Sequence, residues 1–535
     1  MKNTRSILAQ LLVVFMLGCN IQDLDFDNIQ APEIDGVYAA PLGELTYTMS
    51  ELLDEIGDQS AELLEDPETG VLYLEYRDSA SFNTSSDLIN INDVSNSASF
   101  ELPATAPLGT PQTVTIDTSF TFDYEPDQNE RIDLLEYITG TINLTVSTSL
   151  ALNINYSVTI ENTTLNSIPV TLSGTVSNGN SPQISSQDLA NHETVLDFQG
   201  GLNIFSVDIN LVIPLAAGEG IGGGESFDFQ VDYIDQTFSL VQGQFGQDTV
   251  NVGNTILDIP FFSDLEGEGL KLGSPTIQFD FANSFGLPIG ILFGGMYSID
   301  NNNGTNDTIF LNGSVTETPQ IVAGADVPGN TQETTLTINK SNSSLAELLA
   351  VSPDQIGFDL QAVTNPDDDT QTNFMQDNSS IETSILVTMP LAIQLEDLTR
   401  EISFDLGGGL DFSEADSAVL RIVTYNGLPF SGEMDVEVYN ANDSLLFIAA
   451  ENLVLQTPFI GNDGIVTQIR SITADIPIGP SGIAAFKNGS SLNLRITLNT
   501  PASLSANDIF VKIRNIDSLH VKVSAVAAVK YQIEK

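Results

Sequence analysis

The sequence predicts an all-β protein built of tandem β-sandwich modules, with short helices between the strands. Three observations carry this prediction. Val, Ile, Thr, Phe and Tyr alternate with polar residues in period two along much of the chain. Turns rich in Asn, Gly, Asp and Pro separate these runs. One strand–turn–strand pattern also recurs in order along the second half, which indicates repeated modules.

The first eighteen residues have the pattern of an export signal. Lys2 and Arg5 make a basic start, and the apolar run Ile7–Leu17 follows, which is too short to span a bilayer. Cys19 comes directly after a glycine and is the only cysteine of the chain. This arrangement resembles the lipobox of bacterial lipoproteins, in which the cysteine is acylated. We therefore predict a lipoprotein signal peptide over residues 1–18 and Cys19 as the lipidation site.

Residues 19–36 are predicted to form an acidic tether behind the lipidated cysteine. Their acidic start resembles the surface-export signal of Bacteroidota lipoproteins, although a solvated spacer explains it equally well. No second apolar run approaches the length of a membrane span. We therefore expect the lipid anchor alone to hold the protein at the outer membrane, on its surface or its periplasmic face.

The charge of the chain excludes one class of partner. There are 72 acidic and only 16 basic residues, a formal net charge of −56. Such a surface repels phosphate backbones. Nucleic acid is therefore not expected to bind.

Residues 37–130 are expected to form an N-terminal β-rich region. Within it, Thr48–Glu51 reads as a capping box that opens a helix, and Gly57 ends this helix. A second short helix is predicted from the capping box Ser344–Glu347 in the second half of the chain. These two helices illustrate the short helical segments expected between strands.

The repeated pattern is clearest around Asn283 and Asn426. In both places a strand ends at the Asn, a turn and a Pro follow, and the next strand leads to an Asn-rich tip. The match extends to a Thr-Pro pair at Thr318 and at Thr457, and the offset shrinks gradually along the chain. Asn tolerates the left-handed conformation, and Pro marks an edge or the start of a strand. We infer a duplication, and we expect the region from Leu270 to the end of the chain to fold without the rest.

The repeats set the expected domain boundaries. The two strong copies predict β-sandwich modules over residues 266–400 and 401–535. A weaker third copy around Asn162 predicts a further module over residues 131–265. Each module would be a two-layer sandwich that buries one face of each sheet.

Two resemblances accompany these patterns. The strand–Asn–turn–Pro–strand unit resembles the water-stress and late-embryogenesis β-sandwich domain, which implies an Ig-like sandwich in each module. The N-terminal pattern of Pro41-Leu42, a helix with Leu52-Leu53 and the strand Val71–Tyr76 resembles large acidic outer-membrane and surface lipoproteins of Bacteroidota. Members of that group mostly lack an assigned activity, so the resemblance implies location and fold only.

No catalytic, cofactor-binding or metal-binding residue is predicted. His192 and His520 are the only histidines, and each reads as a strand or loop residue. Gly218–Gly223 satisfies the dinucleotide-binding spacing, but a strand follows it where that motif needs a helix. Asp300–Gly304 resembles the start of a calcium loop, but Leu311 stands where a bidentate Glu is required.

The leading functional hypothesis is a lipid-anchored structural or interaction protein of the cell envelope, an adhesion or scaffold module that binds an envelope or surface protein and has no enzyme activity. The alternative is a carrier of a lipid or other apolar ligand, suggested by the apolar runs Leu211–Ala217 and Leu287–Phe293. A third possibility is a glycan-processing surface enzyme, because 72 acidic residues supply many carboxylate pairs. The absence of Trp argues against this third hypothesis.

Overall fold

The computed structural model describes residues 34–48, 62–82, 91–124, 130–259, 270–299, 308–350, 353, 355–367, 371–406 and 415–531. Cys19, residues 19–33 of the predicted acidic tether, the helix expected after Thr48 and the tip at Asp300–Gly304 lie outside these residues. Residues 34–36, the last three of the predicted tether, belong instead to the first strand of the fold, where they pair with residues 529–531. Within them the predicted all-β fold with short helices is confirmed, and every paired strand is antiparallel. No helix of this part of the chain is long and apolar enough to cross a membrane.

Two compact units make up the chain, and both are assembled from separated stretches. Of the described residues, those within Met1–Met49, Asp397–Pro501 and Ile516–Lys535 belong to unit 1, and those within Ser50–Glu396 and Ala502–Asn515 belong to unit 2. The reason is strand pairing. The first strand, β1 (Ile34–Thr48), pairs along its length with the last strand, β34 (Ser518–Tyr531). The units therefore differ from the contiguous modules that the repeat suggested.

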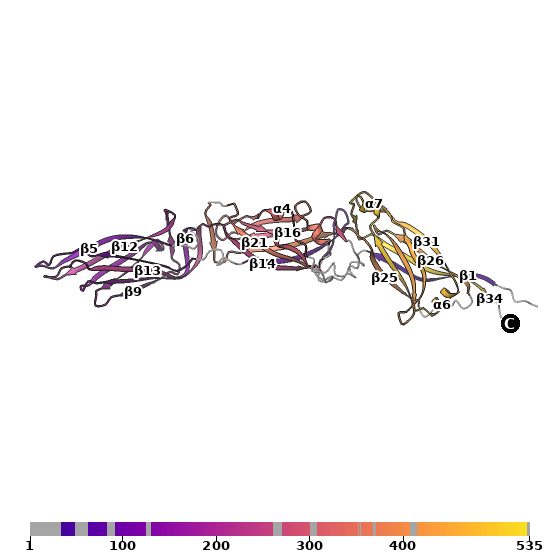
Figure 1. Cartoon of the computed structure of the whole chain (residues 1–535), viewed down its shortest axis with the longest axis horizontal. Coiled ribbons are helices and arrows are strands. Elements are labelled where there is room, and N and C mark those ends of the chain that lie inside the picture. The colour runs from indigo at the N-terminus through magenta and orange to yellow at the C-terminus, as the bar shows by residue number, and fades with distance from the viewer. Residues whose placement is uncertain are drawn as a thin grey trace, which may run out of the picture. The chain divides into compact units, whose positions relative to one another are not determined.

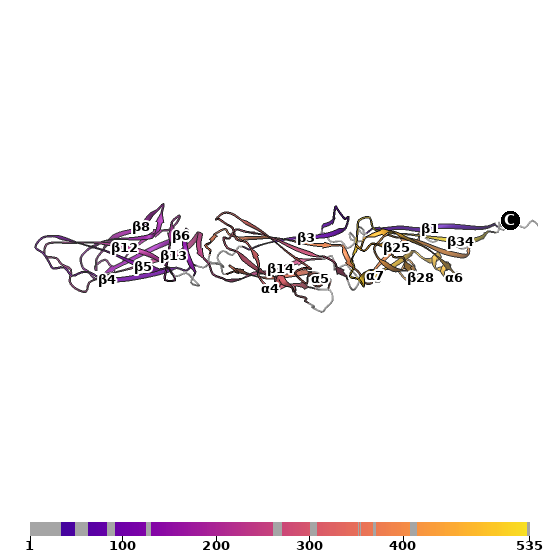
Figure 2. The same ribbon diagram turned by 90° about the horizontal axis from the view of Figure 1, so that it is seen from above.

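Residues 94–244 of unit 2 form a sandwich of two sheets with four main strands each, here called the 94–244 sandwich (Figures 1 and 2). The short strands β11 (Asp197–Gln199) and β22 (Asn373–Gln376) add to these sheets by pairing with β12 and β13. The first sheet has the order β5-β12-β7-β8, and the second has the order β4-β13-β6-β9. The strands are β4 (Val94–Glu101), β5 (Gln112–Asp123), β6 (Arg131–Thr148), β7 (Ile154–Leu165), β8 (Ile168–Val176), β9 (Gln183–Asp188), β12 (Leu202–Leu215) and β13 (Ser226–Gln244). The short strand β10 (Glu193–Val195) pairs with both β6 and β7 and so links the two sheets.

Aromatic side chains fill the core of the 94–244 sandwich. Phe120 on β5 meets Phe229 on β13 edge-on, with ring centroids 5.1 Å apart, and Phe205 on β12 meets Tyr233 on β13 at 5.4 Å. Each contact joins one sheet to the other. The period-two alternation places these rings on the inner face of each strand, which is why the segments fold as half-buried strands.

Two further pairs of sheets share one topology, one pair in each unit. In unit 1 the sheets have the orders β1-β34-β26-β31 and β25-β32-β27-β28. In unit 2 the corresponding orders are β3-β23-β16-β20 and β14-β21-β17-β19, with β2 added beside β3 and β18 beside β21. A short helix precedes β21 in unit 2, as another precedes β32 in unit 1. The remaining bounds are β2 (Glu62–Glu65), β3 (Leu72–Phe82), β14 (Thr249–Asp258), β15 (Lys271–Leu272), β16 (Thr276–Asn283), β17 (Ile289–Leu292), η5 (Phe293–Gly295), β18 (Met296–Ile299), α4 (Ser314–Glu317), β19 (Gln320–Val322), β20 (Gln332–Asn339), α5 (Leu345–Leu349), β21 (Gln355–Thr364), β23 (Ile381–Pro390), β24 (Ala392–Gln394), β25 (Leu398–Asp405), β26 (Ala415–Asn426), β27 (Ser431–Tyr439), β28 (Leu445–Leu455), β29 (Phe459–Ile460), β30 (Val466–Gln468), β31 (Arg470–Ile478), α6 (Pro480–Asn488), β32 (Ser491–Asn499), α7 (Ala502–Ser505) and β33 (Val511–Lys512).

Asn283 and Asn426 occupy the same place in these two topologies. Each is fully buried at the end of its strand, and each accepts a hydrogen bond at Oδ1 from the backbone N–H two residues later. Each Nδ2 also donates to the carbonyl oxygen four residues later and to a second, more distant carbonyl. The same side chain therefore closes the same turn twice, as a duplication requires.

Other parts of the expected correspondence differ in the structure. The second carbonyl belongs to Ala323 in one copy and to Gln456 in the other, so these two positions correspond. Thr318 comes before Ala323, but Thr457 comes after Gln456. The two Thr-Pro pairs are therefore not equivalent. Asn162 lies inside β7 and bonds Val195 and Ser206 instead of its own turn. It is not a third copy of the motif, because the 94–244 sandwich has its own topology.

The boundaries of the N-terminal and C-terminal regions also change. β4 and β5 belong to the 94–244 sandwich, so residues 37–130 do not form a region of their own. A fragment from Leu270 onward would lack β1, β3 and β14, which pair with β34, β23 and β21. We therefore no longer expect that fragment to fold alone. The predicted helix after Ser344 is present as α5, but the Ser344 hydroxyl accepts from the N–H of Asn312 instead of capping the helix.

Candidate interaction surface

The two histidines lie in different units and different environments. His192 is buried in the 94–244 sandwich, where its Nδ1 lies 3.2 Å from the carbonyl oxygen of Ala190. His520 lies on β34 of unit 1. Each histidine therefore belongs to the surroundings of its own unit, and Cys19 falls outside the described residues.

His520 belongs to a polar cluster that joins β1 to β34. Its Nδ1 lies 2.7 Å from the Thr46 hydroxyl, and its Nε2 lies 3.0 Å from Glu44 Oε1. Lys522 Nζ reaches the same carboxylate oxygen at 3.2 Å, and the ring of Tyr425 on β26 lies beside the imidazole. Hydroxyl, imidazole and carboxylate are in the order that nucleophilic catalysis uses. These groups lie on a sheet face, and the Glu44 carboxylate is already paired with Lys522. We therefore interpret the cluster as a set of polar contacts that links β1 to β34.

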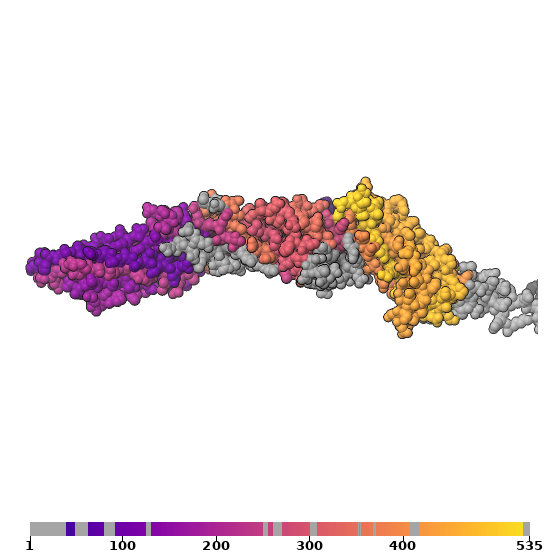
Figure 3. Space-filling view, viewed as in Figure 1, coloured from indigo at the N-terminus to yellow at the C-terminus, as the bar shows by residue number. Residues whose placement is uncertain are grey.

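The outward face of sheet β5-β12-β7-β8 is the most distinctive surface of the 94–244 sandwich, whose indigo-to-magenta surface Figure 3 shows. None of these four strands contains Lys, Arg or His. Most of their outward positions carry hydroxyl, amide or carboxylate side chains, and the apolar exceptions include Ile204, Val212 and Pro214 on β12. We call this surface the polar face, and its members are Thr113, Thr115, Asp117, Ser119, Thr121, Asn155, Ser157, Thr159, Glu161, Thr171, Ser173, Thr175, Ser206, Asp208 and Asn210.

Strand register arranges the polar face in rows that cross the sheet. One row runs from Asp117 through Asn210 and Ser157 to Ser173. In it, Asn210 Nδ2 donates to Asp117 Oδ1 at 2.7 Å. The next row has Asp208 at its centre, between Ser119 and Thr159. A shallow hollow of about 350 Å³ lies over these two rows.

The opposite face of the sandwich, on sheet β4-β13-β6-β9, uses its carboxylates differently. Asp232 accepts a hydrogen bond of 2.6 Å from Ser95, and Asp228 accepts one from Ser99. On the polar face, no side chain among the described residues donates to Asp208. The polar face thus keeps the Asp208 carboxylate without a side-chain donor in the described part of the chain, whereas Asp228 and Asp232 on the opposite face each accept from a serine.

The 94–244 sandwich as a whole is strongly acidic. Between residues 94 and 244 the sequence has eighteen acidic residues and one basic residue, Arg131. Arg131 binds Asp133 at 2.6 Å on β6, outside the polar face. Asp117, Asp208 and Asn210 are not recognisable as one surface from the sequence, although it shows both the alternation of Ser, Thr, Asn and Asp with apolar residues and the lack of cations. Strand order was the missing information.

Buried titratable groups lie in and beside the 94–244 sandwich. Burial raises the pKa of Glu130 to about 7, although Gly246 donates its N–H to that carboxylate. Burial also raises the pKa of Tyr137 to about 12. Its hydroxyl lies 2.9 Å from that of Thr194, and Thr163 continues the hydroxyl chain to Tyr233. All of these groups face inward, so they contribute to the packing of the fold and are not part of an interaction surface.

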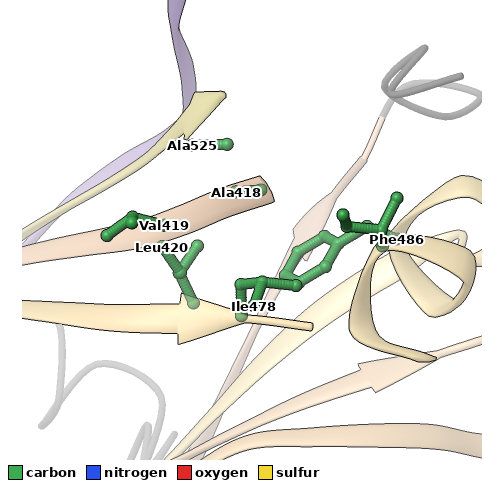
Figure 4. A pocket seen from close by; sticks show the side chains of 7 residues that line it. Ala418, Val419, Leu420, Ile478, Phe486 and Ala525 are labelled. Atoms are coloured by element: carbon green, nitrogen blue, oxygen red, sulfur yellow. The ribbon is translucent and has the colours of Figure 1, made fainter. Parts of the chain in front are cut away.

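Unit 1 contains a small apolar void near α6 (Figure 4). Its volume is about 10 Å³, and Leu420, Ile478 and Phe486 are among the side chains that line it. A space of this size holds at most one water molecule. It cannot take an acyl chain.

No family model matches the chain, and no curated protein matches its sequence. One similar solved structure is a "putative secreted protein" from Parabacteroides distasonis, with 11% identity, coverage of 55% of this chain and 90% of that chain, and a TM-score of 0.34. A structure of the infectious bursal disease virus Gx strain has 10% identity, 84% coverage of each chain and a TM-score of 0.16. PBSX exported protein XepA has 7% identity, coverage of 54% and 86%, and a TM-score of 0.12. Likeness at this level assigns no function.

Proposed function

We propose that this protein is a lipid-anchored structural or interaction module of the cell envelope, and that the polar face of the 94–244 sandwich binds its partner. One observation carries the proposal. The polar face combines a hollow of about 350 Å³ with the Asp208 carboxylate, to which no side chain among the described residues donates, and its four strands contain no basic residue. Such a face is complementary to a protein surface that presents Lys or Arg. The module has no catalytic role in this proposal.

The anchor supplies the location. Export by residues 1–18 and acylation of Cys19 would hold the chain at the outer membrane, because two or three acyl chains bind a bilayer stably. Cys19→Ala should release the exported protein into the soluble fraction. A variant that still sediments with membranes without detergent would contradict the anchor.

The carrier alternative receives less support. Two apolar runs suggested it. The first contains the end of β12, where Leu211, Ile213 and Leu215 are buried in the sandwich core. In the second run, Leu287, Ile289 and Ile291 are likewise buried. A packed core has no room for an acyl chain. Native mass spectrometry of the full Cys19→Ala chain should therefore show the bare polypeptide mass, and a lipid that copurifies near one per chain would favour the carrier.

The polar face can be tested in cells with a photo-crosslinking residue. We expect a discrete crosslinked protein when the crosslinker replaces Thr159 on the polar face, and none when it replaces Ser97 on the opposite face. Asp117→Asn together with Asp208→Asn should reduce crosslinking at Thr159 by about tenfold or more, because a charge pair across an interface contributes about 1.5 kcal/mol or more. The matched control, Asp228→Asn with Asp232→Asn, changes the net charge equally on the opposite face. Equal loss in both double variants would mean that net charge, and not this face, controls binding.

A further inference from the structure

Asn426 is followed by Gly427, and this dipeptide has a chemistry that the fold suppresses. In an Asn-Gly sequence, the backbone nitrogen of the glycine can attack the side-chain amide carbon of the Asn. No Cβ on the glycine hinders this approach. The N–C bond forms as ammonia leaves, and water then opens the cyclic imide to Asp or to isoaspartate. The reaction needs only water and removes the side-chain amide.

The native structure restrains both reacting groups. Asn426 is fully buried. Its Oδ1 accepts a hydrogen bond of 3.0 Å from Leu428, and its Nδ2 donates to Phe430 and Gln456, each at 2.9 Å. The attacking nitrogen, that of Gly427, donates to the carbonyl oxygen of Ser518 at 2.9 Å. The Asn426 amide is therefore held by its own turn and by Gln456, and the Gly427 nitrogen is held by the neighbouring strand at Ser518.

The product cannot rebuild these contacts. A carboxylate has no N–H, so both carbonyl oxygens would lose their donor, and a charge would be placed in a site without solvent. Isoaspartate would also displace the backbone at the end of β26. We propose that Asn426 is a latent deamidation site, protected in native unit 1, whose modification during unfolding prevents unit 1 from refolding.

The duplicated position supplies a natural comparison. Asn283 makes the same hydrogen bonds, but Ser284 follows it, and the Ser284 nitrogen donates to Ser380 at 3.0 Å. Gly427→Ser therefore copies a residue that the fold already accepts at this place. A Cβ at Gly427 would lie 3.0 Å from the Ser518 carbonyl oxygen and 3.1 Å from Cγ2 of Ile469, so both neighbours must move slightly. The added side chain should slow the attack without removing any Asn426 contact.

Asn178, followed by Gly179, is the internal control. It is exposed at the tip between β8 and β9, and Gly179 has open space around it. In the native full chain at mildly alkaline pH, peptide mass spectrometry should show conversion of Asn178 but not of Asn426. Native conversion of Asn426 should be slower by about 1000-fold or more, because that is the scale of the unfolded fraction. In concentrated urea the two should convert at comparable rates.

Refolding then tests the second half of the proposal. Samples are held in urea for increasing times and then diluted to refold. Protection of the β26 and β34 amides from hydrogen exchange should be lost in proportion to the fraction of chains modified at Asn426. The amides of the 94–244 sandwich should recover their protection. Gly427→Ser should retain that recovery. Native conversion of Asn426 as fast as that of Asn178, or normal exchange protection in chains modified at Asn426, would overturn the proposal. If Gly427→Ser does not fold, the comparison of modified and unmodified wild-type chains decides the same question.

Discussion

Replacing Asn283 with Ala should destabilise the pair of sheets β3-β23-β16-β20 and β14-β21-β17-β19 in unit 2 by about 3 kcal/mol. The side chain is fully buried and makes three hydrogen bonds, two from Nδ2 at 3.1 Å and one to Oδ1 at 2.9 Å. Each contributes about 1 kcal/mol net, and any partner that stays buried without a replacement adds to the cost. Native-state hydrogen exchange measures this locally, and amides of β16, β17 and β23 should exchange about 100-fold faster.

The matched experiment uses the second copy and a surface control. Asn426→Ala should produce the same effect in β26, β27 and β34 of unit 1 and leave unit 2 unchanged. Asn442→Ala, at an exposed position in the tip between β27 and β28, should change nothing measurable. A loss below about 1 kcal/mol at both buried positions would refute the view that these side chains close the turns.

Three further predictions concern pH and salt. Glu130→Gln should stabilise the chain by about 1–2 kcal/mol above pH 7 and have little effect below pH 4.5. The reason is that burial raises the pKa of Glu130 to about 7, so ionising this carboxyl in the folded state costs stability. Thermal melts across this pH range check the prediction. Stability should fall as pH rises above about 10, where unfolded tyrosines ionise, because burial raises the pKa of Tyr137 to about 12; Tyr137→Phe should flatten that decline. The melting temperature should rise between low salt and about 0.5 M NaCl, since ions screen the repulsion within a chain of net charge −56; a flat response would show that the carboxylates are already compensated.

Local patterns in the sequence were sufficient for the fold class and for one motif. Period-two alternation predicted strands because it places one side of each strand in a core. The Asn at positions 283 and 426 was identified because its turn chemistry is local, and the structure gives both the same bonds. The capping box at Ser344 predicted the short helix α5 correctly, although not its capping.

The arrangement of units was out of reach because it depends on contacts between distant residues. Nothing near Ile34 in the sequence indicates that its strand pairs with Tyr531. The polar face was missed for the same reason. Asp117, Asn210 and Ser157 lie in three separate segments, and only the order β5-β12-β7 makes them neighbours. Prediction of such a surface needs strand order as well as strand identity.

The placement of β1 has a mechanical consequence. This single strand of fifteen residues enters unit 1 at Ile34 and leaves it at Thr48, from where the chain continues to unit 2. Its backbone is already extended, with a contour of about 50 Å. In the proposed anchored protein, tension between the membrane and a partner held by unit 2 would run along the covalent backbone of β1. The other strands of unit 1 would bear little of that load, so the protein could be pulled without unfolding the unit beside its anchor.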